Sequence, residues 1–217
     1  MKKTILLILA LVAGTSLWAQ SLWDSSHPDK SVTVGLRTGV NFAHADTEGA
    51  TSTRLGFHGG VALDYNIIKS FSLTTGLYYV GKGFRGNQDS NLASVNTESK
   101  TTAHYLQLPI LASWRIEANS GVQFHINIGP YLAYGIGGSA KYKPLDLTLN
   151  DRFENDTFGS TGLFKHFDAG LSFGANVVLG HVLVGASYEL GLTDVGRQAR
   201  FDKFHNRNTN ITIGYNF

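Results

Sequence analysis

The feature that most constrains the fold is a two-residue alternation of apolar and polar side chains, repeated in eight separate segments. Successive side chains of a β-strand point to opposite faces, so each segment is expected to form a strand with one apolar and one polar face. Helical periodicity is nearly absent. The eight expected strands cover residues 31–42, 54–66, 71–82, 104–116, 122–136, 167–179, 182–192 and 209–217.

The connections between these segments alternate in length. Residues 66–70, 117–121 and 180–181 make short turns, whereas 43–53, 83–103, 137–166 and 193–208 form long polar stretches rich in Gly, Asn, Asp and Ser. Short turns at one end and long loops at the other are typical of outer-membrane barrels with both termini in the periplasm. The sequence therefore predicts an all-β fold, an eight-stranded antiparallel up-and-down transmembrane β-barrel.

Alternation also fits a soluble barrel with the opposite sidedness, such as an exported lipocalin-like ligand carrier. Composition favours the membrane form, because only 16% of residues are charged and the polar faces carry mostly Gly, Ser, Thr, Asn and Gln. Glycines on those faces suit a narrow interior. Aromatic residues near the strand ends are typical of girdles at the membrane interfaces; they are Tyr65, Phe71, Tyr79, Trp114, Tyr134, Phe167, Tyr188 and Tyr215.

The first twenty residues differ from the rest of the chain. Two lysines precede an apolar run from residue 5 to 13 and a group of small residues with a cleavage site after Ala19, which together indicate a secretory signal peptide. The apolar run is too short for a membrane-spanning helix, the alternative interpretation. We expect a signal peptide at 1–20, a short periplasmic tail at 21–30 and the barrel at 31–217.

Charge gives no sign of a nucleic-acid partner. The chain has 18 basic and 16 acidic residues, and Lys2 and Lys3 are the only charges in the signal peptide, so the remaining chain balances to zero. The lumen of an eight-stranded barrel is just wide enough for side chains to fill it. Its charges are therefore expected to form a paired polar network that plugs the lumen, with a conducting pore as the alternative. The expected members are Arg37, His58, Asp64, Lys82, Arg115, His125, Asp168 and Glu189.

Nothing in the sequence indicates a catalytic, cofactor or metal site. The eight histidines have no pair at a ligand spacing, there is no cysteine, and the acidic stretch 146–158 lacks the glycine and spacing of a calcium loop. His181, Ser187 and Glu189 fall on one expected strand face and raise the alternative of a lipid-modifying enzyme. About 20 Å of strand separates His181 from Ser187, so a histidine of another strand would have to approach instead.

The chain is similar to outer-membrane proteins at its last strand, where apolar residues alternate up to a final Phe. That resemblance implies a signal read by the barrel-insertion machinery, formed by Ile211, Ile213, Tyr215 and Phe217. The chain also resembles the PorT-like outer-membrane β-barrel family of Gram-negative bacteria. The resemblance rests on GLYYVGKG (76–83), HYLQLPILASWRI (104–116), GPYLAYGIGG (129–138), FDAGLSFGANV (167–177), YELGLTDV (188–195) and NITIGYNF (210–217).

This resemblance implies an outer-membrane location and a single barrel, with a link to type IX protein secretion in some members. Members commonly carry an acidic residue at the position of Gln107, from which this chain departs. We therefore expect a monomeric, non-enzymatic barrel in outer-membrane lipid, without cofactors. Long loops are frequent sites of function, so we expect any protein partner to bind there.

Overall fold

The computed structural model describes residues 23–46, 51–90, 95–118, 121–144, 153–158, 164–196 and 205–217. They form a closed antiparallel barrel of eight long strands, as the alternation predicts. The barrel strands are β1 (Val32–Asp46), β3 (Arg54–Ile68), β4 (Phe71–Ser90), β5 (Val95–Ala118), β6 (Val122–Pro144), β8 (Phe167–Leu179), β9 (Val182–Gly191) and β10 (His205–Asn216). Two short strands, β2 (Thr51–Ser52) and β7 (Phe153–Asp156), pair with the outer ends of β4 and β6.

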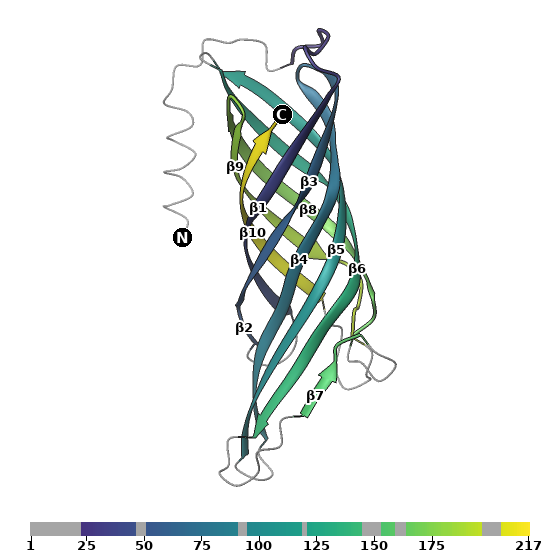
Figure 1. Cartoon of the computed structure of the whole chain (residues 1–217), viewed down its shortest axis with the longest axis vertical. Helices are drawn as coiled ribbons and strands as arrows, with labels where there is room; N and C mark the ends of the chain where they lie inside the picture. The colour runs from purple at the N-terminus through teal and green to yellow at the C-terminus, as the bar shows by residue number, and fades with distance from the viewer. Residues whose placement is uncertain are drawn as a thin grey trace.

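Each barrel strand pairs with its neighbours in sequence, and the pairing of β1 with β10 closes the cylinder. The register runs from Gly35 opposite Asn216 to Asp46 opposite His205. The strands are strongly tilted to the long axis of the molecule (Figure 1). Closure gives each described barrel strand a paired neighbour on both sides, which is the condition for a sheet to lie in hydrocarbon.

The two faces of the sheet confirm the expected sidedness. Apolar side chains point outward, and exposures reach 62% at Leu55 and 53% at Ile213. Polar side chains point inward, and Asn41, Ser113 and Asp168 are completely buried. The molecule is thus apolar outside and polar inside, the reverse of a lipocalin-like carrier. No helix among the described residues is long and apolar enough to cross a bilayer.

The lumen is narrow enough that several positions require glycine. A Cβ atom at Gly39 would collide with the carbonyl oxygen of Ile211, and one at Gly170 would collide with that of Leu190. Short turns join the strands at one end, which we call the turn end. Gly121 and Gly180 lie in two of them with φ angles of 75° and 59°, a conformation that favours glycine.

The strands are longer than predicted at the opposite end, which we call the loop end. The stretch 83–103 was expected to be a loop, but β4 continues to Ser90 and β5 begins at Val95. β6 likewise reaches Pro144. Together with β7, these strands project beyond the rest of the barrel (Figure 1). The prediction was wrong because it required an apolar face, whereas a hairpin outside the bilayer keeps its hydrogen bonds without one.

The tail before β1 is fixed against the turn end. The backbone of Ser70 donates to the carbonyl of Asp24 at 3.1 Å, and the Asp24 amide donates to the Ser70 hydroxyl at 2.6 Å. Closer to β1, the side chain of Asn66 donates to the carbonyl of Lys30 at 2.7 Å. The Lys30 ammonium in turn donates to the Phe217 carbonyl at 3.2 Å. The tail therefore contacts both the β3–β4 turn and the end of β10.

Candidate functional site

The lumen contains two groups of charged side chains at different depths. The group nearer the loop end, the outer charge cluster, consists of Lys82 on β4, Asp168 on β8 and Glu189 on β9. The Lys82 ammonium lies 3.5 Å from Asp168 and 3.4 Å from Glu189. All three side chains are almost completely buried, with 2%, 0% and 6% exposed. Burial of charges at this level is tolerated only where they are paired, and Lys82 lies between the two carboxylates without a hydrogen bond to any described residue.

Uncharged side chains complete the coordination of the two carboxylates. Gln107 donates to one oxygen of Glu189 at 2.7 Å, and Asn210 donates to the same oxygen at 3.2 Å. Asn208 donates to the other oxygen at 3.3 Å. Asp168 accepts from the hydroxyl of Thr193 and the amide of Asn206, both at 2.9 Å. These five donors come from β5, β10 and the segment after β9, so the cluster ties the barrel wall together.

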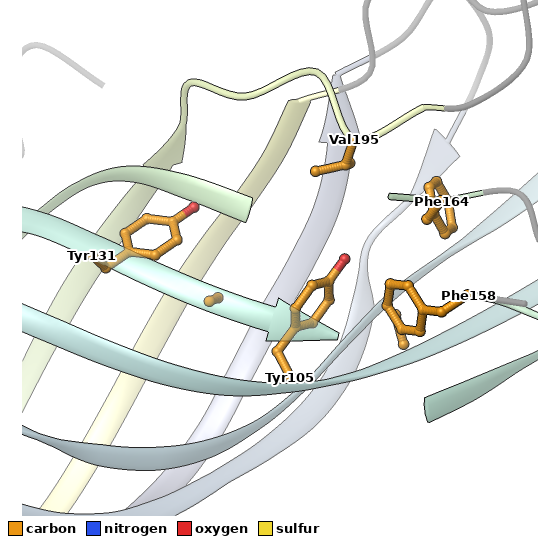
Figure 2. Close-up of a cluster of buried hydrophobic side chains, with 7 residues drawn as sticks. Tyr105, Tyr131, Phe158, Phe164 and Val195 are labelled. Atoms are coloured by element: carbon orange, nitrogen blue, oxygen red, sulfur yellow. The ribbon is translucent and has the colours of Figure 1, made fainter. Parts of the chain in front are cut away.

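Aromatic and apolar side chains cover the outer charge cluster on the side of the loop end. We call this group the mouth cluster, and it consists of Ala103, Tyr105, Tyr131, Ala133, Phe158, Phe164 and Val195. The rings of Tyr105 and Phe158 meet edge to face with centroids 5.3 Å apart (Figure 2). Lys82 lies 4.6 Å from the ring centroid of Tyr131 and 5.4 Å from that of Tyr105, within the range of cation–π attraction.

The mouth cluster is built partly from segments outside the barrel strands. The backbone of Thr157 donates to Gly138 on β6 at 3.3 Å, and its hydroxyl donates to the carbonyl of Thr102 on β5 at 2.9 Å. Phe164 pairs with Gly196 as an isolated bridge. These bonds fix the segments that carry Phe158, Phe164 and Val195, and Figure 2 shows their side chains gathered near the ring of Tyr105.

The second group, the inner charge cluster, lies nearer the turn end and consists of Arg37 on β1, Asp64 on β3 and Arg115 on β5. The Asp64 carboxylate lies 3.7 Å from Arg37 and 4.0 Å from Arg115. It also accepts a short hydrogen bond from the Thr74 hydroxyl. Arg37 donates to the side-chain oxygen of Asn216 at 2.6 Å, which links β1 to the last strand. This cluster has two cations and one anion, whereas the outer cluster has one cation and two anions.

The two expected lumen histidines take separate places. His58 lies between the clusters, with Nε2 3.0 Å from the Thr212 hydroxyl. His125 lies opposite Arg115 on the neighbouring strand, with Nε2 3.2 Å from the side-chain oxygen of Gln123. Both rings are buried, with 6% exposed. Within the described ranges, no group of three His, Asp or Glu side chains could hold a metal ion.

The structure places all eight predicted lumen residues on the inner face of the barrel and divides their charges between the two clusters. Sequence reasoning left out Gln107, Asn208, Asn210, Thr193 and the mouth cluster. The period-two pattern put Gln107 and Asn210 on the polar face, so that signal was available. Phe158 and Phe164 are aromatic, but the stretch that holds them also contains Leu145, Leu147, Leu149, Phe153 and Leu163, so the sequence carries no clear signal for the mouth cluster.

The hydrolase alternative required a histidine near Ser187. His181 lies in the β8–β9 turn with its ring stacked on Tyr215, centroids 5.4 Å apart, so it does not share the inward face of Ser187. The Ser187 hydroxyl accepts a hydrogen bond from the side chain of Asn210 at 3.1 Å. The expectation of one shared face was wrong because the strand begins only at Val182, after His181.

The residues of the expected insertion signal lie on the lipid-facing side of β10. Ile211, Ile213, Tyr215 and Phe217 are 50%, 53%, 46% and 59% exposed. Tyr215 and Phe217 contact each other with ring centroids 5.3 Å apart.

The family model that matches this chain agrees with this architecture. No curated protein matches the chain. Among solved structures, Ail of Yersinia pestis, crystallised with the heparin analogue sucrose octasulfate, is 13% identical with a TM-score of 0.46, covering 87% of this chain and all of Ail. OprG of Pseudomonas aeruginosa is also 13% identical with a TM-score of 0.46, covering 90% of this chain and 99% of OprG. The model of the outer membrane protein beta-barrel domain matches residues 18–197. The chain therefore belongs to the outer membrane protein beta-barrel domain family and is an outer-membrane protein.

Proposed function

We propose that this outer-membrane barrel is a PorT-like, non-enzymatic protein with a closed lumen, and that it acts by binding a protein partner at the loop end. The proposal of a closed lumen is supported by one observation: Lys82 is buried between two carboxylates and lies next to the mouth cluster. An ion crossing the barrel would have to displace that lysine, separate its ion pairs and pass the aromatic rings above it. The inner charge cluster adds a second obstacle of the same kind.

Planar-bilayer recording of the purified barrel tests the closed lumen. We expect no steady openings from the natural chain at neutral pH. The double variant Lys82→Ala and Arg37→Ala removes one long cation from each cluster, so it is expected to conduct at least intermittently. Steady, large openings from the natural chain would refute the closed lumen.

The binding role is supported by the shape of the loop end. Strands β4, β5 and β6 have 20, 24 and 23 residues, whereas about 9–11 suffice to cross a bilayer at the usual tilt. A sheet of this length outside the membrane presents a large ordered surface to a partner. By its PorT-like motifs, we propose that the partner belongs to a protein secretion system.

Cross-linking from a single cysteine tests this role, and the natural chain has no cysteine to interfere. Gly137 on β6 is a suitable position, because nothing lies within 4 Å of a Cβ atom placed there. We expect Gly137→Cys to cross-link a protein in the source bacterium, and Asp29→Cys in the tail at the turn end to serve as the matched control. Loss of the chain should also cause secreted proteins to accumulate in the periplasm, and normal secretion would refute the secretion link.

The absence of enzymatic function is tested directly. Purified protein is expected to show no acyl transfer or lipid hydrolysis, and any such activity that Ser187→Ala abolishes would contradict the proposal. Ser187 is the appropriate control, because its hydroxyl faces the lumen and accepts a hydrogen bond from the side chain of Asn210.

The route to the membrane completes the proposal. We propose that residues 1–20 are removed as a signal peptide and that residues 21–30 remain as the periplasmic tail. The lipid-facing side chains of β10 then serve as the signal for the insertion machinery, and the inserted barrel is monomeric. Mass spectrometry of the purified protein tests the cleavage, and Phe217→Ser should reduce the yield of heat-modifiable barrel in the outer membrane. Unchanged yield would argue against that signal.

A further inference from the structure

The two arginines of the inner charge cluster are unequally supplied with hydrogen-bond acceptors. Arg37 donates to the side-chain oxygen of Asn216 at 2.6 Å and to two backbone carbonyls at 3.2 and 3.4 Å. Arg115 reaches the carboxylate of Asp64 only at 4.0 Å, and its Nε atom is buried without a hydrogen-bond partner among the described residues. A charge-assisted hydrogen bond is about 2.7–2.9 Å long, so the contact between Arg115 and Asp64 is an ion pair without a hydrogen bond.

A buried hydroxyl beside Arg115 also has no partner. Strand β4 lies between β3 and β5, so the side chain of Arg115 crosses the inner face of β4 to reach Asp64. Ser72 lies on that face, opposite Ser113 of β5, and is completely buried. Its Oγ atom has no hydrogen-bond partner in the described part of the chain. Two groups that can donate hydrogen bonds therefore lie side by side, and leaving them unpaired in a buried place is unfavourable.

The charge of the inner cluster favours an acceptor that is negatively charged. Asp64 is the only carboxylate of the described residues within 4.0 Å of either arginine, so the cluster has a formal excess of one positive charge. The outer charge cluster has the opposite excess, but its two carboxylates accept hydrogen bonds from five uncharged donors. The excess charge of the outer cluster is thus stabilised by neutral side chains. At the Nε atom of Arg115 no described side chain has that role.

We propose that the inner charge cluster is a binding site for one small monovalent anion with the chemistry of chloride. The two guanidinium groups come from β1 and β5 and converge on the same oxygen of Asp64, so two cations surround one point of the lumen. An anion at this point accepts hydrogen bonds from Arg115 Nε and the Ser72 hydroxyl and neutralises the excess charge. One negative charge suffices, and the narrow lumen of an eight-stranded barrel selects a small ion.

The position of Arg115 gives the anion a route of entry. Arg115 lies close to the end of β5 at Ala118, and 13% of its side chain is exposed, compared with 7% for Arg37. An ion can therefore reach the inner charge cluster from the turn end without passing the outer charge cluster. The inference is independent of the closed lumen and of the binding role of the loop end.

Crystals of the natural chain grown in sodium bromide test the site directly, because bromide has the charge of chloride and is located by its anomalous scattering. We expect an anomalous peak within hydrogen-bond distance of Arg115 Nε and Ser72 Oγ. Crystals that show bromide elsewhere but not at this point would overturn the proposal and mean that water alone solvates Arg115.

Urea unfolding in lipid vesicles tests whether the anion binds in solution. An ion that binds only the folded barrel stabilises it, so the natural chain should unfold at a higher urea concentration in sodium chloride than in sodium gluconate of equal ionic strength. Arg115→Gln should abolish this difference. Lys82→Met is the matched control, because it removes a buried cation from the outer cluster and should keep the difference. A chloride effect that persists in Arg115→Gln would be a general effect of salt and would overturn the proposal, as would a bromide peak without any chloride effect.

A hydroxyl variant tests the site without changing its charge. Ser72→Ala should need about tenfold more chloride for half of the stabilisation, because a hydrogen bond to a charged group is worth roughly that factor in affinity. Ser187→Ala, which removes a lumen hydroxyl near the outer charge cluster, should leave the chloride titration unchanged. An unchanged titration in Ser72→Ala would refute the assigned position of the anion. A conducting natural barrel would refute the closed lumen alone, so the two proposals can fail separately.

Discussion

Replacing Lys82 with methionine should lower the unfolding free energy by about 3 kcal/mol, because it leaves two buried carboxylates without their common cation. Removal of one partner from a buried ion pair typically costs about 3–5 kcal/mol. The lower end applies here, since Glu189 and Asp168 keep five uncharged donors after the substitution. Methionine has a similar length and flexibility, so packing against Tyr131 is largely retained. The decrease in unfolding free energy therefore measures the effect of removing the charge.

The assay is urea unfolding of the barrel in lipid vesicles, followed by tryptophan fluorescence and by the shift in gel mobility on heating. Lys165→Met is the matched control, because Lys165 is exposed and its ammonium donates to the carbonyl of Asp194 at 2.9 Å. That change should stay within about 0.5 kcal/mol. A loss below about 1 kcal/mol for Lys82→Met would refute the reasoning that the ion pairs stabilise the closed barrel.

A double variant separates the charge effect from a packing effect. Lys82→Met combined with Asp168→Asn removes one cation and one anion, so less uncompensated charge stays buried than in the single lysine variant. The two changes should therefore be less than additive, with a coupling of about 1 kcal/mol or more. Strict additivity would mean that Lys82 and Asp168 do not interact energetically, despite their separation of 3.5 Å.

Three further predictions concern the wall, the mouth and the tail. Gly39→Ala should destabilise the barrel by about 1–3 kcal/mol in the same urea assay, because the added Cβ atom would collide with a carbonyl oxygen of β10. Gly137→Ala is the control and should be neutral, because no atom lies within 4 Å of a Cβ atom at that position. Phe158→Ala should cost about 3 kcal/mol through loss of a 5%-exposed ring from the mouth cluster, and a loss under 1 kcal/mol would mean that this ring is not packed. Hydrogen bonds from Ser26 lower the pKa of Asp24, so this contact stabilises the docked tail above the ordinary pKa of 3.8 and is lost as the pH falls through the lowered value. Tryptophan fluorescence from the tail should change over that acidic range, and Asp24→Asn should abolish the change.

Period-two alternation was sufficient to predict the wall of this barrel because lipid acts on one face and the lumen on the other. It placed Lys82 and Glu189 on the inward face correctly, since each strand needs only its own sequence for that assignment. The alternation could not predict that Lys82 and Glu189 form an ion pair. Which inward residues meet depends on the stagger of strands that lie far apart in the chain, and that stagger belongs to the closed cylinder.

The loop end was predictable only in part, for a related reason. Outside the bilayer neither face of a hairpin needs to be apolar, so the alternation stops at a point where the strand continues. The hydropathy pattern gives no sign that the backbone of Arg85 pairs with Lys100 and that of Asp89 with Asn96. Phe158 and Phe164 of the mouth cluster do not stand out in the sequence, because other Leu and Phe residues lie in the same stretch. Their inward position follows only when the rings of Tyr105 and Tyr131 are known to lie beneath them.

The asymmetry between the two ends indicates where this protein can meet other molecules. At the turn end short turns join the strands, and the tail covers part of the rim through Asp24 and Lys30. At the loop end, β5 has 24 residues. If about 10 cross the bilayer, roughly 14 remain, which at about 3.3 Å each amount to roughly 45 Å of strand. In the proposed closed barrel, a molecule arriving from outside meets the mouth cluster before it reaches the outer charge cluster. The projecting sheet of β4, β5, β6 and β7 is therefore the surface on which recognition can be built, and its backbone pairing holds it in place independently of any partner.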